Sequence, residues 1–218
     1  MEKKINVVIT DDHKLFRKGI AALLSDFEFV NNIYEAGNGI ELLNLLQTLD
    51  SKPDIILLDL GMPEMDGAEA QKLVRSLYPE IKIIILTMED DEHMIIHLIE
   101  EGINGYLLKN ADPEEMELAI RKVVQQGFYF STDITELIIR GFKQKKNKHI
   151  NITEELTKKE LLVLELICKQ NTAVEIAIKM TLSARTIEGY RRKLMDKTGT
   201  KNMAGLVVFA IKNKLVNV

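Results

Sequence analysis

Short runs of apolar residues in the first half of the chain predict buried strands. Residues 5–10 form a short run rich in β-branched residues, and residues 55–58 and 81–86 are almost wholly apolar. Such runs suit the strands of a parallel sheet, because helices cover both faces of that kind of sheet. Weaker strand patterns lie at residues 30–36 and 103–108. We therefore expect five strands.

Between these strands the apolar residues recur at helical spacing, and Asp112-Pro113-Glu114-Glu115 is a strong start signal for a fifth helix. Strands that alternate with helices over residues 1–127 predict an α/β fold. We expect a five-stranded, doubly wound parallel sheet of the flavodoxin-like kind, with strand order 2-1-3-4-5. The apolar residues that mark the first four helices are Leu15, Ile20, Leu23, Leu24, Leu42, Leu43, Leu45, Leu46, Leu49, Leu73, Val74, Leu77, Ile95, Ile96 and Ile99.

Polar residues follow the strands where such a sheet binds its ligands. Asp11 and Asp12 follow the first strand, and Asp59 follows the third. If these strands are neighbours, three carboxylates meet in one crevice and repel one another unless a cation lies between them. Oxygen ligands of this kind suit Mg²⁺. Thr87 and Lys109 end the fourth and fifth strands and offer a hydroxyl and a cation to a phosphate.

Each of these residues also has a simpler interpretation. A single aspartate after a strand is usually a helix cap or a turn residue, and Lys109 alone could be a solvated loop lysine. The interpretation as a site depends on complementary chemistry at the ends of four of the five strands. An aspartate in such a site can act as a nucleophile and form an aspartyl-phosphate.

The last third of the chain predicts a small all-α domain of four helices. Two capping boxes, Thr157-Lys158-Lys159-Glu160 and Thr172-Ala173-Val174-Glu175, open the first two helices, and Ser183 caps the third. The third helix carries several basic residues and follows a tight turn, which is the arrangement of a helix-turn-helix. A small helical bundle with an ordinary charged face is the alternative. The fourth helix is expected near residues 202–213.

Charge separates the two parts of the chain. The net charge is −4, yet Asp and Glu outnumber Lys and Arg over residues 1–142, whereas the reverse holds over residues 149–218. A basic end favours polyanions such as nucleic acid. No apolar run approaches the length of a membrane span, no signal peptide is evident, and one cysteine excludes an internal disulfide. We expect a cytoplasmic protein with no membrane partner.

The spacing of Asp11-Asp12, Asp59, Thr87 and Lys109, with the run from Asp59 to Gly67, resembles the receiver domain of two-component response regulators. The resemblance implies that Asp59 accepts a phosphoryl group from a sensor histidine kinase. It also implies that Asp12, Asp59 and the carbonyl of Gly61 hold Mg²⁺, while Asp11 acts through water. Thr87 and Lys109 would contact the phosphoryl group.

The same resemblance implies that Thr87 and Tyr106 form a switch pair, and that Gly67 has a structural role. An ordinary half-buried strand aromatic is the alternative for Tyr106. Met88 follows Thr87 where many receivers carry a smaller residue. That departure leaves the lifetime of the phosphate open.

The second domain resembles the LuxR-type DNA-binding domain through Leu156-Thr157-Lys158-Lys159-Glu160, Glu175-Ile176-Ala177, the run from Ser183 to Glu188, and Lys197-Thr198-Gly199. The whole chain thus resembles the NarL/FixJ class of response regulators. Tyr190 departs from a histidine that is frequent in the family, and Gly189 interrupts the helix at a contact position. The candidate DNA-binding residues are Arg185, Thr186, Glu188, Gly189, Arg191, Arg192 and Lys193.

The fourth helix resembles the dimerisation helix of that family, with Ala204, Val208 and Ile211 as candidate interface residues. Core positions are the alternative for all three. The resemblance implies a homodimer when the chain is phosphorylated. Dimers of this kind bind paired half-sites about one helical turn apart on double-stranded promoter DNA.

These patterns predict a receiver over residues 1–127, a linker over 128–150 and the DNA-binding domain over 151–218. The linker contains a short helical pattern at 133–142 and a lysine run at 143–148, which we interpret as solvated; contact with DNA phosphates is the alternative. Among isolated features, His13 is expected in the first turn of a helix, His93 and His97 as an exposed pair, and Cys168 as a small buried hydrophobe.

The function expected is that of a phosphorylation-dependent transcription regulator, not of an enzyme that acts beyond its own phosphorylation and dephosphorylation. One alternative is a Mg²⁺-dependent phosphatase or hydrolase that uses Asp59; the basic helix-turn-helix argues against it. Another is a phosphate-independent DNA-binding protein with a vestigial receiver. The complete acidic cluster argues against that one.

Overall fold

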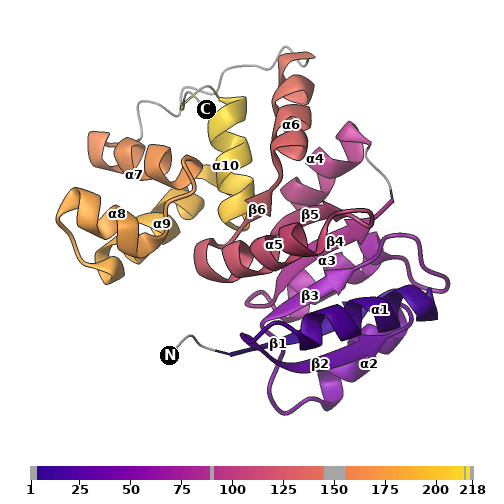
Figure 1. The fold of residues 1–218 in the computed structure, drawn as a ribbon. Helices are drawn as coiled ribbons and strands as arrows, with labels where there is room; N and C mark the ends of the chain where they lie inside the picture. Colours follow the sequence, from indigo (N-terminus) through magenta and orange to yellow (C-terminus); the bar gives the residue numbers. More distant parts are fainter. Residues whose placement is uncertain (1–3, 89–90, 145–155, 214, 217–218) are drawn as a thin grey trace.

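The structure is a computed structural model, and it describes residues 4–88, 91–144, 156–213 and 215–216. It consists of an N-terminal α/β domain, a helix that follows it, and a C-terminal helical domain that packs against both (Figure 1). The lysine run lies largely outside the described residues, so nothing in the structure bears on it.

The N-terminal domain contains a parallel sheet with strand order β2-β1-β3-β4-β5-β6. The first five strands have the predicted order. The prediction of five strands was one short, because a two-residue strand pairs with β5 at the edge of the sheet. The strands are β1 (Ile5–Thr10), β2 (Val30–Ala36), β3 (Ile55–Leu58), β4 (Lys82–Thr87), β5 (Gly105–Leu108) and β6 (Tyr129–Phe130).

Five helices flank this sheet and explain why its strands are almost wholly apolar. Successive residues of β1 enter different cores: Val7 and Ile9 pack with α1 and α5, whereas Val8 packs with α2, α3 and α4. Both faces of the strand are therefore buried. The helices are α1 (Lys14–Ser25), α2 (Gly39–Thr48), α3 (Gly67–Leu77), α4 (Glu92–Glu101) and α5 (Pro113–Gln126).

The first part of the predicted linker, which follows α5, has regular secondary structure. It forms β6 and then α6 (Thr132–Gln144), which begins one residue before the predicted helical pattern and ends two residues after it. Phe130, Ile134 and Ile138 of this segment are buried. Helix α6 packs against α4, so this part of the chain extends the apolar core of the first domain.

The C-terminal domain consists of the four expected helices: α7 (Lys158–Cys168), α8 (Ala173–Met180), α9 (Ala184–Thr198) and α10 (Met203–Lys212). Both predicted capping boxes are present, with Thr157 and Thr172 each accepting from the backbone of the glutamate three residues on. Ser183 caps α9. Helix α10 lies beside α6 and α4 and forms most of the contact between the two domains (Figure 1).

Candidate functional site

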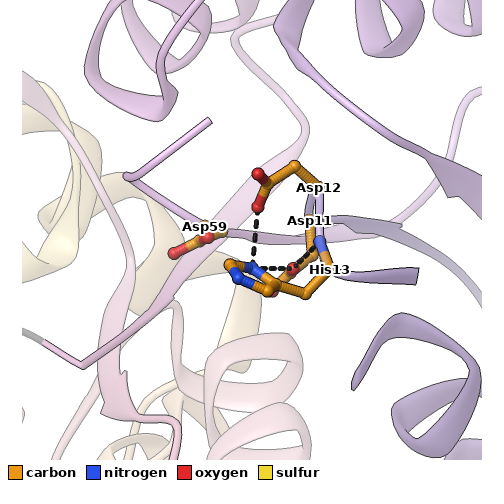
Figure 2. A group of neighbouring side chains, drawn as sticks. All are labelled: Asp11, Asp12, His13 and Asp59. Carbon is orange, nitrogen blue, oxygen red and sulfur yellow. Dashed lines mark hydrogen bonds and ion pairs between the residues drawn. The ribbon is translucent and has the colours of Figure 1, made fainter. Parts of the chain in front are cut away.

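Three carboxylates meet at the carboxyl ends of β1 and β3, as predicted. The two strands are neighbours and pair Thr10 with Leu58, which brings the residues that follow them together. One ligand atom from each of Asp11, Asp12, His13 and Asp59 lies within 4.8 Å of the others (Figure 2). Asp11 and Asp59 are buried and Asp12 is exposed, so this acidic cluster opens toward solvent on one side.

Lys109 neutralises the buried part of the acidic cluster. Its Nζ lies 2.7 Å from Asp11 Oδ2 and 2.8 Å from Asp59 Oδ2. Burial acts to lower the pKa of Lys109, but the hydrogen bonds and charges of Asp11 and Asp59 outweigh it, so the pKa is raised above its usual value. The ammonium group therefore stays charged and holds the two carboxylates together.

His13 lies closer to this chemistry than its position in the sequence indicated. It is the N-cap of α1, one residue before the helix, where a first-turn position was expected. Its backbone N–H donates to Asp11 Oδ1 at 2.8 Å, and its Nδ1 lies 2.8 Å from Asp12 Oδ1 (Figure 2). The only available signal was its position directly after two aspartates.

Of the remaining N-terminal candidates, Thr87 and Gly61 follow the strands toward the same edge of the sheet, whereas Tyr106 lies nearer the amino end of β5. Thr87 ends β4 and is buried, and Tyr106 in β5 is wholly buried. Gly61 lies two residues after Asp59 in the loop between β3 and α3. Met88 is 72% exposed, so its side chain does not fill the crevice.

Gly67 is required by the backbone that carries Asp59. A Cβ on this residue would lie 2.0 Å from the Asp59 carbonyl oxygen, a distance that no packing could relieve without moving the backbone. The residue before it, Asp66, caps α3 by accepting from the Glu69 N–H at 2.8 Å. The predicted structural role of Gly67 is confirmed: it lets the start of α3 pass directly against the phosphoacceptor candidate.

A buried carboxylate on α7 fixes the position of α9. Glu160 is fully buried, and its oxygens lie 3.1 Å from Lys193 Nζ and 2.9 Å from Lys197 Nζ. Burial acts to raise the pKa of Glu160, but the two lysines and the capping interaction with Thr157 overcome it and lower the pKa to about 2. The sequence indicated the capping role of Glu160, not this pairing.

Most of the candidate DNA-binding residues lie on the exposed side of α9. A Cβ added at Gly189 would meet no atom within 4 Å, so the fold does not require glycine there. Lys193 is 59% exposed although its ammonium is paired with Glu160. The exposed candidates are Arg185, Thr186, Glu188, Gly189, Arg192 and Lys193.

Arg191 differs from the other candidates because its side chain points into the molecule. It is buried, and its Nη2 donates to the Gln126 carbonyl at the end of α5, at 3.0 Å. Its Nη1 lies 3.0 Å from Glu188 Oε1. In this conformation Arg191 contacts the N-terminal domain rather than solvent.

The candidate dimerisation residues are covered as well. Ala204 and Val208 are buried and Ile211 is half-buried. Val208 and Ile211 line a cavity of about 50 Å³ together with Phe130 of β6 and Ile138 of α6. This face of α10 is thus occupied by the chain itself.

Apart from His13, the isolated residues have the environments that were expected. His93 and His97 are exposed on α4, and the acidic cluster with His13 is the metal-compatible group found within the described ranges. Cys168 is buried, and burial raises the pKa of its thiol to about 12. Among the described helices, none is long and apolar enough to cross a membrane.

Comparison with known families assigns each domain. Residues 7–121 match the response regulator receiver domain, and residues 154–210 match the bacterial regulatory proteins of the luxR family. The chain is 35% identical over 217 residues to the oxygen regulatory protein NreC of Staphylococcus aureus (strain MRSA252). That alignment covers 97% of this chain and 99% of NreC.

Solved structures give the same result. A structure of the response regulator RcsB from Salmonella typhimurium matches with a TM-score of 0.58 at 28% identity, over 94% of this chain and 98% of that chain. A complex of RcsB with DNA also matches with a TM-score of 0.58 at 28% identity, over 95% of this chain and 98% of that chain. With its two domains matched in order and NreC similar over its whole length, this chain belongs to the two-component response regulators that join a receiver to a LuxR-type DNA-binding domain.

Proposed function

We propose that this regulator accepts a phosphoryl group on Asp59 from a sensor histidine kinase, and that the phosphate switches its dimerisation and its binding to promoter DNA. The observation that supports this most directly is the position of Asp59. Its carboxylate is buried, lies in one cluster with the exposed Asp12, and is already paired with the cation of Lys109. We also propose a cytoplasmic location, where such a kinase domain and the DNA are both accessible.

The residues around Asp59 fit a magnesium ion. Their donors are carboxylate oxygens, which Mg²⁺ prefers, and one side of the cluster is open to water. Asp12, Asp59 and the Gly61 carbonyl would hold the ion, with Asp11 acting through water. When bound, Mg²⁺ neutralises the negative charge of the phosphoryl oxygens.

In the transfer itself, an oxygen of the Asp59 carboxylate attacks phosphorus as the bond from phosphorus to the donor nitrogen breaks, and the nitrogen keeps the electron pair. Lys109 then pairs with a phosphoryl oxygen in place of the Asp59 oxygen it holds at 2.8 Å. The Thr87 hydroxyl donates a hydrogen bond to another phosphoryl oxygen. Both contacts draw the ends of β4 and β5 toward the phosphate.

Thr87 and Tyr106 would transmit the movement of β4 and β5 from the phosphorylation site to the rest of the domain. Thr87 pairs with Leu108, and Tyr106 lies two residues earlier in the same strand, β5. Tyr106 is already wholly buried in this structure, so movement of Thr87 toward the phosphate would change the packing around its ring and thereby repack the face formed by α4, β5 and α5. The phosphate thus biases a two-state element.

DNA binding is assigned to α9 and pairing to α10. Helix α9 would enter the major groove with Arg185, Thr186, Glu188 and Gly189 near the bases, while Arg192 and Lys193 contact phosphates or guanine edges. The Ala204, Val208 and Ile211 face of α10 would contact a second copy. Two copies would then bind half-sites about one helical turn apart.

A test of the phosphoacceptor uses acetyl phosphate as the donor. We expect the wild-type chain with Mg²⁺ to gain about one equivalent of acid-labile phosphate, and Asp59→Asn to gain none. Asp54→Asn is a matched control, because Asp54 ends the loop before β3 and accepts from the Asn6 backbone outside the cluster. Labelling that persists in Asp59→Asn would contradict the assignment, and continuous release of phosphate would favour the phosphatase alternative.

A further inference from the structure

A cavity of about 370 Å³ lies between the receiver and α9, away from the acidic cluster. Its walls are Lys82 at the start of β4, residues 124–127 at the end of α5, one face of α9, and the first residue of α10. Lys82 pairs with Ile55 at the start of β3, whereas Asp59 follows the end of that strand. The volume is in the range of small-molecule sites, so we ask which ligand the cavity would accept.

Helix α9 contributes one continuous face to the cavity. Glu188, Arg191, Arg192 and Met195 are spaced i, i+3, i+4 and i+7, which places them on the same side of the helix. Arg192 is exposed and Arg191 is buried, so one guanidinium lies toward the mouth of the cavity and the other is covered by the molecule.

Lys82 reaches the cavity from the receiver. Ile84 and Leu86 of the same strand pack in the core that contains α1 and α5, and side chains two residues apart in a strand lie on the same face. Lys82 therefore lies on the α5 face of the sheet. With it, the cavity walls contain three cationic side chains and one carboxylate, that of Glu188, which is an excess of two positive charges.

Capping of α5 does not account for this excess charge. The last carbonyls of a helix carry partial negative charge and attract cations. At the end of α5, however, the Gln126 carbonyl already accepts from Arg191 Nη2 at 3.0 Å, and the Gly127 carbonyl accepts from Asn104 Nδ2 at 2.8 Å. The cations of Lys82 and Arg192 are additional to these caps.

Two buried polar atoms on the cavity walls lack a hydrogen-bond partner among the described residues. They are Nε of Arg191, a donor, and Oε1 of Gln126, an acceptor, on side chains that are 6% and 2% exposed. Buried polar atoms in folded proteins are nearly always paired. A ligand that offers both an acceptor oxygen and a hydroxyl would satisfy both atoms.

The rest of the cavity is apolar. Val124, Met195 and Met203 contribute aliphatic and thioether groups to its walls. Methionine side chains are flexible and adapt to partners of irregular shape. The cavity thus offers an apolar surface beside its cations, which suits an organic anion better than a simple inorganic one.

Hydrogen bonds between the two domains hold the walls in place. Asn202, the residue before Met203, caps α10 and donates its Nδ2 to the carbonyls of Gly102 and Ile103, at 2.7 and 2.8 Å. Together with the bond from Arg191 to the end of α5, these contacts fix α9 and α10 relative to the sheet. The cavity is therefore a formed site in this structure.

We propose that this cavity binds a small phosphorylated organic molecule, whose doubly charged phosphoryl group pairs with Lys82, Arg191 and Arg192 while its apolar part packs on Met195 and Met203. A dianion matches the excess of two positive charges, whereas a single carboxylate neutralises only half of it. A DNA duplex is too wide to enter a cavity of this volume, so the site differs from the promoter contacts proposed for α9.

Phenylphosphonate is a suitable probe, because it joins a doubly charged group to an aromatic ring and its phosphorus–carbon bond does not transfer a phosphoryl group. Titration calorimetry at about pH 8 measures its binding to the full-length wild type. We expect a dissociation constant of about 1 mM. No binding of phenylphosphonate would overturn the proposal.

Three further probes separate charge from apolar contact. Inorganic phosphate lacks the ring and benzoate lacks the second charge, so each should bind at least about fivefold more weakly than phenylphosphonate. Benzyl alcohol has the ring without any charge and should show no binding. Benzoate that binds as tightly as phenylphosphonate would contradict a phosphoryl site, and equal binding of inorganic phosphate would contradict the apolar contact.

Two variants test whether both domains contribute. Lys82→Gln removes a cation of the receiver and Arg192→Gln one of α9, and each should weaken phenylphosphonate binding about five- to tenfold. Lys169→Gln is the matched control, because Lys169 is exposed at the end of α7 and pairs with Glu165 outside the cavity. Unchanged binding in either cavity variant, or an equal loss in Lys169→Gln, would overturn the proposal.

These measurements are independent of the proposed function. They use unphosphorylated protein without DNA, and without Mg²⁺ the acidic cluster repels anions. The comparison of probes uses the wild type alone, so it remains decisive if a variant fails to fold. Failure of acetyl phosphate to label Asp59 would refute the phosphoacceptor and leave the cavity supported, whereas failure of phenylphosphonate to bind would do the reverse.

Discussion

At the scale of single residues, Lys109 decides how three carboxylates can share one crevice. Its ammonium lies within 2.8 Å of both Asp11 and Asp59, and all three side chains are almost fully buried. Coulomb repulsion between such carboxylates is offset only while a cation lies between them. The lysine therefore stabilises the fold before any phosphate arrives, and under the proposed function it would contact the phosphate afterwards.

Lys109→Ala should lower the free energy of unfolding at pH 7 by about 3 kcal/mol without divalent cations, because it leaves two buried carboxylates unpaired. Adding Mg²⁺ should recover part of that loss, and more in the variant than in the wild type. Urea unfolding with and without MgCl₂ measures both effects. Equal stabilisation of the two proteins by Mg²⁺ would argue against ion binding at this cluster.

At the scale of elements, the packing of α7 against α9 depends on a charge inside the domain. Glu160 opens α7 and pairs with Lys193 and Lys197, which lie one turn apart on α9. A buried carboxylate is tolerated only with such partners. The pairing sets the rotation of α9 about its own axis, and thereby the residues that α9 presents to solvent.

The lowered pKa of Glu160 predicts acid sensitivity. Its pKa is about 2 in the folded chain and 4.5 when unfolded, so its contribution is full above 4.5 and is lost as the pH falls from there toward 2. Glu160→Gln keeps a capping side chain but removes the charge. In urea unfolding between pH 6 and pH 3, the stability of the wild type should therefore approach that of Glu160→Gln. If the stabilities of the two proteins instead changed in parallel with pH, the lowered pKa of Glu160 would be refuted.

The same elements show how far the sequence predicts structure. Helix starts and strand ends are local features, so the caps at Thr157, Thr172 and Ser183 and the aspartates at the carboxyl ends of β1 and β3 follow from neighbouring residues. The short strand β6 does not, because two residues carry no periodicity and its pairing depends on the exposed edge of β5.

Contacts between segments that are far apart in the sequence could not be predicted from it either. Nothing near Arg191 in the sequence marks it as the residue of α9 that bonds the end of α5, and nothing near Asn202 marks its bonds to the end of α4. Both depend on how the two domains meet. The charged side chains of α9 could be proposed as DNA contacts from the helix-turn-helix pattern and the family resemblance, but they could not be divided into inward and outward groups.

At the scale of the whole molecule, the two domains divide the charge between them. Acidic residues are in excess over residues 1–142 and basic residues over 149–218, although the net charge of the chain is −4. In this structure the acidic domain lies beside the basic one. An acidic neighbour weakens the attraction of a basic domain for a polyanion.

Arg192→Ala should weaken binding to selected paired-site DNA and reduce the slope of log affinity against log salt by about 1 per protomer, because one phosphate contact is lost. Lys169→Ala is the matched control, since Lys169 is exposed but pairs with Glu165 at the end of α7. Fluorescence anisotropy across a salt series gives both slopes. Identical slopes for Arg192→Ala and the wild type would exclude Arg192 from the interface.

The acidic cluster lies at one edge of the sheet, and the hydrogen bonds from Asn202 to the Gly102 and Ile103 carbonyls lie at the opposite edge. Asp11 and Asp59 follow the carboxyl ends of β1 and β3, whereas Gly102 and Gln126 precede the amino ends of β5 and β6. A kinase that approaches Asp59 therefore meets the same exposed edge whether the DNA-binding domain is docked or free. Access to Asp59 would then be the same in both arrangements, so a kinase would not have to wait for the DNA-binding domain to move away before it transfers the phosphoryl group.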